Sequence, residues 1–104
     1  MTVLQGEIAE FSCQAKGRPP PSIMWVQRFS NQVQIEITEQ EDVIIDTIQS
    51  GARQTRSTLT INSAQPQDAV EYLCNATNEA GTNIQLATLT VHGNNYPCLI
   101  IVYV

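Results

Sequence analysis

Three cysteines and one histidine are the residues of this 104-residue chain with the most distinctive chemistry. Because three is an odd number, at most one disulfide can form within the chain, between two of Cys13, Cys74 and Cys98. A catalytic nucleophile would need a base within reach and a third group to orient that base. The only histidine, His92, precedes a glycine and is expected to be a solvated residue at the end of a strand. The sequence therefore predicts no enzyme activity and no small-molecule substrate.

Acidic side chains outnumber basic ones by ten to five, which gives a net charge of −5. Five of the acids lie between Glu36 and Asp46, and clustered carboxylates are potential calcium ligands. These acids lack the regular spacing of a dedicated calcium loop, so a solvated edge is expected, with no metal and no cofactor. The excess of acid argues against a basic surface for nucleic acid and against docking on anionic membranes.

The elements that must position these residues are predicted to be β-strands. Apolar and polar residues alternate with a period of two, and no stretch sustains a helical period beyond two turns. Turn signals interrupt the alternation about every ten residues, and about seven or eight short strands of this kind are typical of an antiparallel β-sandwich. The predicted strands cover residues 7–16, 22–29, 33–38, 43–48, 56–63, 71–78 and 82–91.

A set of core candidates recurs in order along these strands. Cys13 and Cys74 lie at the centres of two predicted strands, and both fall on the side that is expected to face inward. Trp25 follows Cys13 by twelve residues and lies on the inward side of the next strand. The whole set, in chain order, is Cys13, Trp25, Leu59, Asp68, Tyr72 and Cys74.

Together with its neighbours, this set resembles the immunoglobulin superfamily, and specifically its intermediate or I-set type. The resemblance covers residues 3–92 and implies an all-β, immunoglobulin-like antiparallel sandwich as a domain over residues 1–92. It implies a disulfide between Cys13 and Cys74 that joins the two sheets and packs against Trp25. It also implies core positions for Leu59, Asp68 and Tyr72, with the tyrosine hydroxyl bonded back to the preceding connection. The matching motifs are Gly6-Glu7, Phe11-Ser12-Cys13, Gly17 with Pro19 to Pro21, Ile23-x-Trp25, Ser57-x-Leu59-x-Ile61, Asp68, Tyr72-x-Cys74, Ala76-x-Asn78-x-Ala80-Gly81 and Ala87-x-Leu89-x-Val91.

Two functions follow from this resemblance, because I-set domains occur both in adhesion and receptor proteins and in the domain chains of muscle and cytoskeletal giants. The first is an extracellular protein-binding module of a cell-surface adhesion molecule or receptor. The second is a structural module of an intracellular cytoskeletal or sarcomeric protein. A paired Cys13 and Cys74 would fit the oxidising compartment of the first, whereas intracellular relatives keep similar cysteines reduced.

A binding face can be predicted from the alternation of side chains in the sheet that the resemblance assigns to Trp25, Cys74 and Leu89. The residues between the inward-facing ones should point outward and form an exposed apolar patch for a protein partner, either a second copy in a homodimer or another cell-surface protein. Asn75 lies in the same patch and begins the only N-glycosylation sequon. A glycan there would cover the patch, and an unmodified Asn75 would leave it open. The predicted patch consists of Met24, Val26, Leu73, Ile84 and Leu86.

Residues 93–104 do not match the I-set pattern and are expected to be a non-domain end that carries Cys98 as a free thiol. Their apolar run, 99–104, is far shorter than the roughly 20 residues of a bilayer span. Three origins are open for it: a membrane span that is cut short, a divergent end from alternative splicing, or a segment that either pairs as an extra strand or bridges two molecules through Cys98.

Overall fold

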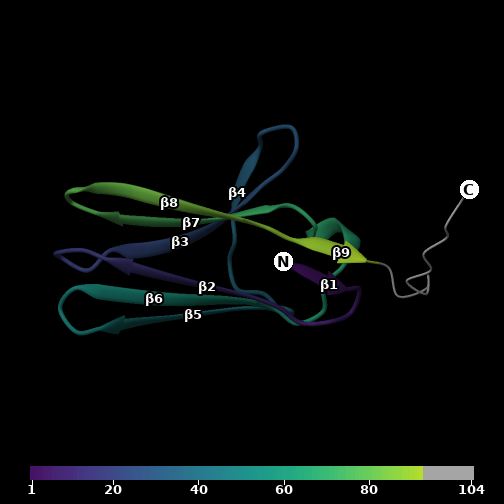
Figure 1. Ribbon diagram of the computed structural model, residues 1–104, viewed down its shortest axis with the longest axis horizontal. Coiled ribbons are helices and arrows are strands. Elements are labelled where there is room, and N and C mark those ends of the chain that lie inside the picture. The colour runs from purple at the N-terminus through teal and green to yellow at the C-terminus, as the bar shows by residue number, and fades with distance from the viewer. Residues whose placement is uncertain (93–104) are drawn as a thin grey trace, which may run out of the picture.

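Two β-sheets packed face to face form the body of the molecule, as the computed structural model shows for the described residues, 1–92 (Figure 1). One sheet has the strand order β2-β6-β5 and the other has the order β4-β3-β7-β8. A third, two-stranded sheet joins β1 to β9 in parallel. The elements are β1 (Thr2–Leu4), β2 (Ala9–Lys16), β3 (Ser22–Arg28), β4 (Gln34–Glu36), β5 (Val43–Ser50), β6 (Gln54–Ile61), the 3-10 helix η1 (Pro66–Asp68), β7 (Glu71–Asn78), β8 (Gly81–Thr88) and β9 (Thr90–His92).

The antiparallel sandwich predicted from the alternation of residues is confirmed, with differences at both ends of the chain: β1 was not predicted, and the predicted last strand is divided. The predicted strand 82–91 is two strands, because Leu89 interrupts the pairing between β7 and β8. The Leu89 side chain is buried in the core, and its N–H donates to the carbonyl of Val70. The chain then continues as β9, which pairs with β1 instead of β7.

A single core fills the space between the sheets, and it contains most of the residues expected there. Trp25, Leu59 and Tyr72 are buried, and Leu59 has no exposed surface. The ring of Phe11 stacks on Tyr72 with 4.8 Å between the ring centroids. Such aromatic contacts add to the hydrophobic stabilisation of the core.

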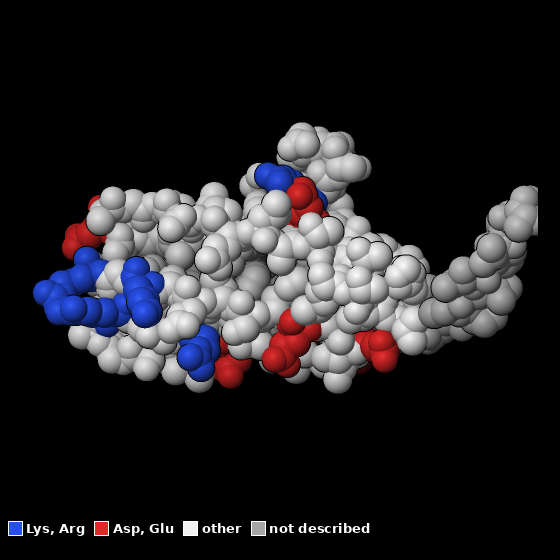
Figure 2. Space-filling model, viewed as in Figure 1, with Lys and Arg blue, Asp and Glu red and all other residues white. Residues whose placement is uncertain are grey.

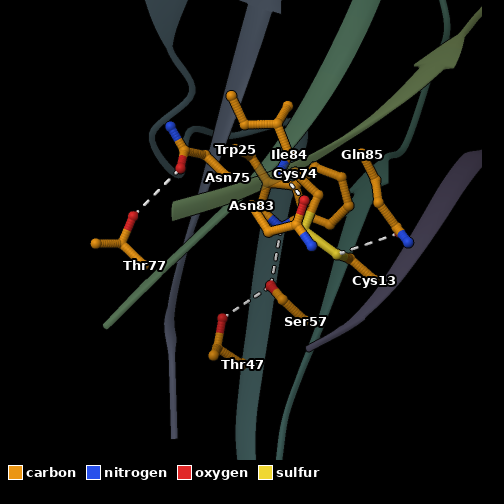
Figure 3. Close-up of a disulfide and its surroundings, with 10 residues drawn as sticks. All are labelled: Cys13, Trp25, Thr47, Ser57, Cys74, Asn75, Thr77, Asn83, Ile84 and Gln85. Carbon is orange, nitrogen blue, oxygen red and sulfur yellow. Dashed lines mark hydrogen bonds between the residues drawn. A yellow bond between two sulfur atoms is a disulfide. The ribbon is translucent and has the colours of Figure 1, made fainter. Parts of the chain in front are cut away.

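The Cys13–Cys74 disulfide is formed at the centre of this core and joins β2 to β7 across the two sheets (Figure 3). Trp25 lies directly opposite Cys74 in the β3–β7 register. The buried indole Nε1–H donates to the Ser57 hydroxyl at 2.8 Å, and that hydroxyl is also bonded to the Thr47 hydroxyl. These bonds satisfy the polar groups that the core encloses, so their burial carries no penalty for unpaired donors.

Within the described residues, no helix has the length and hydrophobicity needed to cross a lipid bilayer. The predicted tail of residues 93–104, with the predicted free thiol Cys98, lies outside the part of the chain that the structure describes.

Candidate interaction face

Tyr72 lies near the start of β7, one of the strands that form the candidate interaction face, and a hydrogen bond holds it in place. Its hydroxyl donates a 2.6 Å hydrogen bond to the backbone carbonyl of Asp68. The Asp68 carboxylate accepts from the N–H of Gln65 and thereby caps η1. Asp68 was expected in the core, but it is only half-buried, because its carboxylate belongs to this cap at the surface. The bonds hold the connection between β6 and β7 against the end of the sandwich.

Replacing this hydroxyl in Tyr72→Phe should lower the free energy of unfolding by about 1 kcal/mol, the net value of one such hydrogen bond. Burial raises the pKa of Tyr72 to about 12, whereas an unfolded tyrosine ionises near pH 10. Between these values the unfolded state binds fewer protons, so the stability of the native domain should fall as the pH rises from about 10 to about 12. Urea unfolding across this pH range should show that the Tyr72→Phe variant loses less stability than the wild type as the pH rises.

The outer face of the four-stranded sheet carries apolar side chains in two rows that cross β3, β7 and β8. One row places Met24 opposite Asn75 and Asn75 opposite Ile84. The next row places Val26 opposite Leu73 and Leu73 opposite Leu86. Met24 is 40% exposed, and Ile84 and Leu86 are each 52% exposed. These three residues, with Asn75 between two of them, are here called the apolar face.

Two residues predicted to be exposed in this patch are buried: Val26 is 7% exposed and Leu73 is 5% exposed. Both lie on the central strands of the sheet, where each has a side chain on either side in the register. Val26 is flanked by Leu73 and by Glu36 of β4, and Leu73 is flanked by Val26 and Leu86. Met24 has no neighbour of this kind on the β4 side, because β4 pairs only with Val26–Arg28. Val26 and Leu73 therefore form the floor of the apolar face.

Polar pairs border the apolar face on both ends. Arg28 and Glu71 lie opposite each other in the register and form an ion pair of 2.9 Å. The hydrogen bond from Arg28 lowers the pKa of Glu71. At the other end, the Thr77 and Thr82 hydroxyls are 3.0 Å apart. An apolar centre with a polar rim is the usual anatomy of a protein–protein interface.

Asn75 is half-buried at the centre of this arrangement, and its Oδ1 accepts a 3.3 Å hydrogen bond from Thr77, the last residue of its sequon (Figure 3). Because the register places Asn75 between Met24 and Ile84, a glycan on it would stand over the apolar face.

The residues considered for catalysis or metal binding do not form a cluster within the described part of the chain. His92, the last residue that the structure describes, is exposed at the end of β9. Residues 1–92 contain no group of three or more His, Cys, Asp or Glu side chains arranged to hold a metal ion.

Comparisons with known proteins agree with this architecture. The profile of the Immunoglobulin I-set domain matches residues 1–91. The human leucine-rich repeat and immunoglobulin-like domain-containing nogo receptor-interacting protein 3 is 36% identical over 92 residues, which cover 88% of this chain and 14% of that protein. The mouse basement membrane-specific heparan sulfate proteoglycan core protein is 31% identical over 97 residues, which cover 93% of this chain and 2% of that protein. A solved complex of titin M10 with an obscurin-like 1 immunoglobulin domain contains a chain that superposes with a TM-score of 0.69 at 30% identity, covering 88% of this chain and 84% of that one.

These matches cover the sandwich and its central disulfide, and this chain spans only a small part of either curated relative. Domains of the matching type are typically non-catalytic binding or structural modules. On this evidence the chain belongs to the immunoglobulin I-set family.

Proposed function

We propose that this domain is an extracellular protein-binding module of a larger cell-surface adhesion molecule or receptor, and that it binds through its apolar face. The observation that carries the proposal is the exposure of Met24 on β3 and of Ile84 and Leu86 on β8, on either side of β7 in one sheet face. A single exposed apolar residue is ordinary on a protein surface, whereas a contiguous group with a polar rim is typical of a contact site.

The partner can be a second copy of this chain or another cell-surface protein. A second copy fits the face because two identical patches can meet across a two-fold axis, so that one row of apolar side chains contacts the same row of its partner. The relative named as a nogo receptor-interacting protein supports a binding role for a domain of this kind.

The extracellular location is supported by three independent features. The Cys13–Cys74 disulfide fits an oxidising compartment. The sequon at Asn75 can be used only in a secreted or membrane protein. One relative is named as a basement-membrane protein. No catalytic role is proposed for this domain.

Asn75 decides whether the apolar face is available. If the chain carries a glycan there, the glycan would keep the face hydrated and prevent flat contact. The proposal therefore applies to the form with an unmodified Asn75, and a mass shift on enzymatic deglycosylation of the secreted chain identifies the other form.

A structural module of an intracellular cytoskeletal or sarcomeric protein is the second candidate, and the likeness to the titin-containing complex favours it. The two candidates differ in the state of Cys13 and Cys74 in the natural source. Because both side chains are buried, the protein from its natural source must be unfolded without a reductant before thiol labelling. Labelling should then leave both cysteines unmodified if the module is extracellular, and should modify both if it is an intracellular structural module.

Substituting the apolar face should weaken self-association of the unglycosylated domain. Ile84→Asp and Leu86→Asp should each raise the dimer dissociation constant by about tenfold or more, because each places a charge in an apolar contact. Sedimentation equilibrium measures this directly. Ile48→Asp is the matched control, because Ile48 is 56% exposed on the opposite sheet. If Ile48→Asp weakens the dimer as much as the other two substitutions do, the apolar face is not the contact surface.

A further inference from the structure

Basic side chains gather at one end of this acidic domain. Of its five Lys and Arg residues, Lys16 ends β2, Arg18 follows in the β2–β3 connection, Arg53 lies in the β5–β6 turn, and Arg56 lies near the start of β6. Figure 2 shows the resulting blue surface at the end where these connections lie in Figure 1. Lys16, Arg18 and Arg53 are here called the basic end.

Hydrogen bonds fix the loops that carry the basic end. The N–H of Gly17, between Lys16 and Arg18, donates to the carbonyl of Arg53 at 2.8 Å and so ties the two connections together. The Thr55 hydroxyl donates to the carbonyl of Pro21 at 2.7 Å. The charged side chains therefore project from a preformed backbone, which reduces the entropy that a ligand must overcome on binding.

Gly17 is required for this close packing. The Asn78 amide donates to the carbonyl of Pro19 at 3.0 Å and brings the β7–β8 hairpin against the same connection. A side chain at position 17 would place its Cβ 2.9 Å from the Asn78 Nδ2 atom. A side chain at position 17 would therefore displace the Asn78 amide and break its hydrogen bond to Pro19.

The basic end encloses a shallow recess of about 470 Å³, lined by Lys16, Gly17, Arg18 and Arg53. All three cations are exposed, and the ion pair found within residues 1–92 is formed elsewhere, by Arg28 with Glu71. No carboxylate of the described chain lies within ion-pair distance of these three cations. Their charge is therefore available to a ligand.

We propose that the basic end binds a sulfated polysaccharide. Guanidinium groups present donors in a planar fork that matches the oxygens of a sulfate group, and a chain of regularly spaced sulfates can contact several cations at once. The recess holds no aromatic side chain on which a nucleic acid base could stack. It also lacks the aromatic or large apolar anchor that dominates most protein contacts. The chain's net charge of −5 should keep a polyanion away from the remaining surface.

Binding of a fluorescent heparin oligosaccharide to the full 104-residue chain, followed by anisotropy at several salt concentrations, tests this assignment. Arg18→Gln combined with Arg53→Gln should weaken binding about ten- to thirtyfold, the effect of losing two exposed charge contacts. The dependence of the affinity on salt should also become shallower, because fewer counterions are released. Arg28→Gln removes the same type of charge at the far end of β3 and should change the affinity by no more than about twofold.

Two further variants keep the test independent of folding. Lys16→Gln should weaken binding on its own. Glu79→Gln should strengthen it, because Glu79 lies in the β7–β8 turn next to Asn78, whose amide is hydrogen-bonded to the β2–β3 connection that carries Arg18, and its negative charge repels sulfate. Thermal unfolding of each variant shows that it is folded. The proposal is overturned if Arg28→Gln weakens binding as much as the double variant does. It is equally overturned if the unsulfated polysaccharide hyaluronan binds as well as heparin, or if polyglutamate competes better than heparin, which would indicate an acidic protein partner.

Discussion

Removing the disulfide by Cys13→Ala with Cys74→Ala should lower the free energy of unfolding by about 4 kcal/mol. The two cysteines are 61 residues apart, so the disulfide closes a long loop and restricts the unfolded chain strongly. Both side chains are buried between the sheets, and alanine leaves no unpaired polar group in their place. A loss of this size is a large share of the total stability of a domain of about 100 residues.

Urea unfolding of three forms separates the disulfide from the packing of its sulfur atoms: the oxidised wild type, the reduced wild type and the double alanine variant. All three should carry Cys98→Ala, so that the third thiol cannot exchange with the disulfide. The reduced wild type should lose most of the stability that the double variant loses. A difference between the oxidised and reduced forms below about 1 kcal/mol would show that the disulfide does not restrict the unfolded chain as expected.

Leu59→Ala should destabilise the domain by about 3–4 kcal/mol, through lost burial and the cavity left behind. Leu59 has no exposed surface, and it lies between Phe11 of β2 and Ile45 of β5 in the three-stranded sheet. Its neighbours belong to both edges of that sheet, so they cannot close over the space without moving the strands.

Leu86→Ala is the matched control for this core substitution, because it removes the same atoms from a side chain that is 52% exposed. It should change the unfolding free energy by less than about 1 kcal/mol, since little apolar surface returns to water. Both variants are measured by urea unfolding of the monomer. Equal losses for the two variants would mean that Leu59 is not part of a close-packed core.

The sandwich was predictable because its evidence is local. Alternating residues within each strand indicate the inward side, and Cys13, Trp25 and Cys74 all fall on it. β1 was not predictable in this way, because it is three residues long and pairs with β9 at the other end of the chain. The break at Leu89 depends on the same distant pairing.

The apolar face was only partly predictable. Alternation predicts which way a side chain points. It does not predict whether neighbouring side chains bury it, because that depends on the adjacent strands. Val26 and Leu73 point outward with Met24 and are nevertheless buried by their cross-strand neighbours. Met24 remains exposed because β4 ends before reaching it. The lengths of neighbouring strands therefore decide which outward residues can meet a partner.

The basic end could not be predicted from the total charge of the chain. A net charge of −5 predicts no basic surface, yet Lys16, Arg18 and Arg53 converge from two connections that are far apart in the sequence. Their convergence depends on the hydrogen bond between Gly17 and Arg53, which no local sequence pattern predicts.

The most direct test of the proposed contact is a concentration series followed by methyl NMR of the unglycosylated domain. If two copies meet through the apolar face, the methyl signals of Met24, Ile84 and Leu86 should shift together with concentration, described by one dissociation constant. The signals of Ile44 and Ile48, exposed on the opposite sheet, should stay in place. Shifts confined to Ile44 and Ile48, or no concentration-dependent shift of Met24, Ile84 and Leu86, would contradict the account.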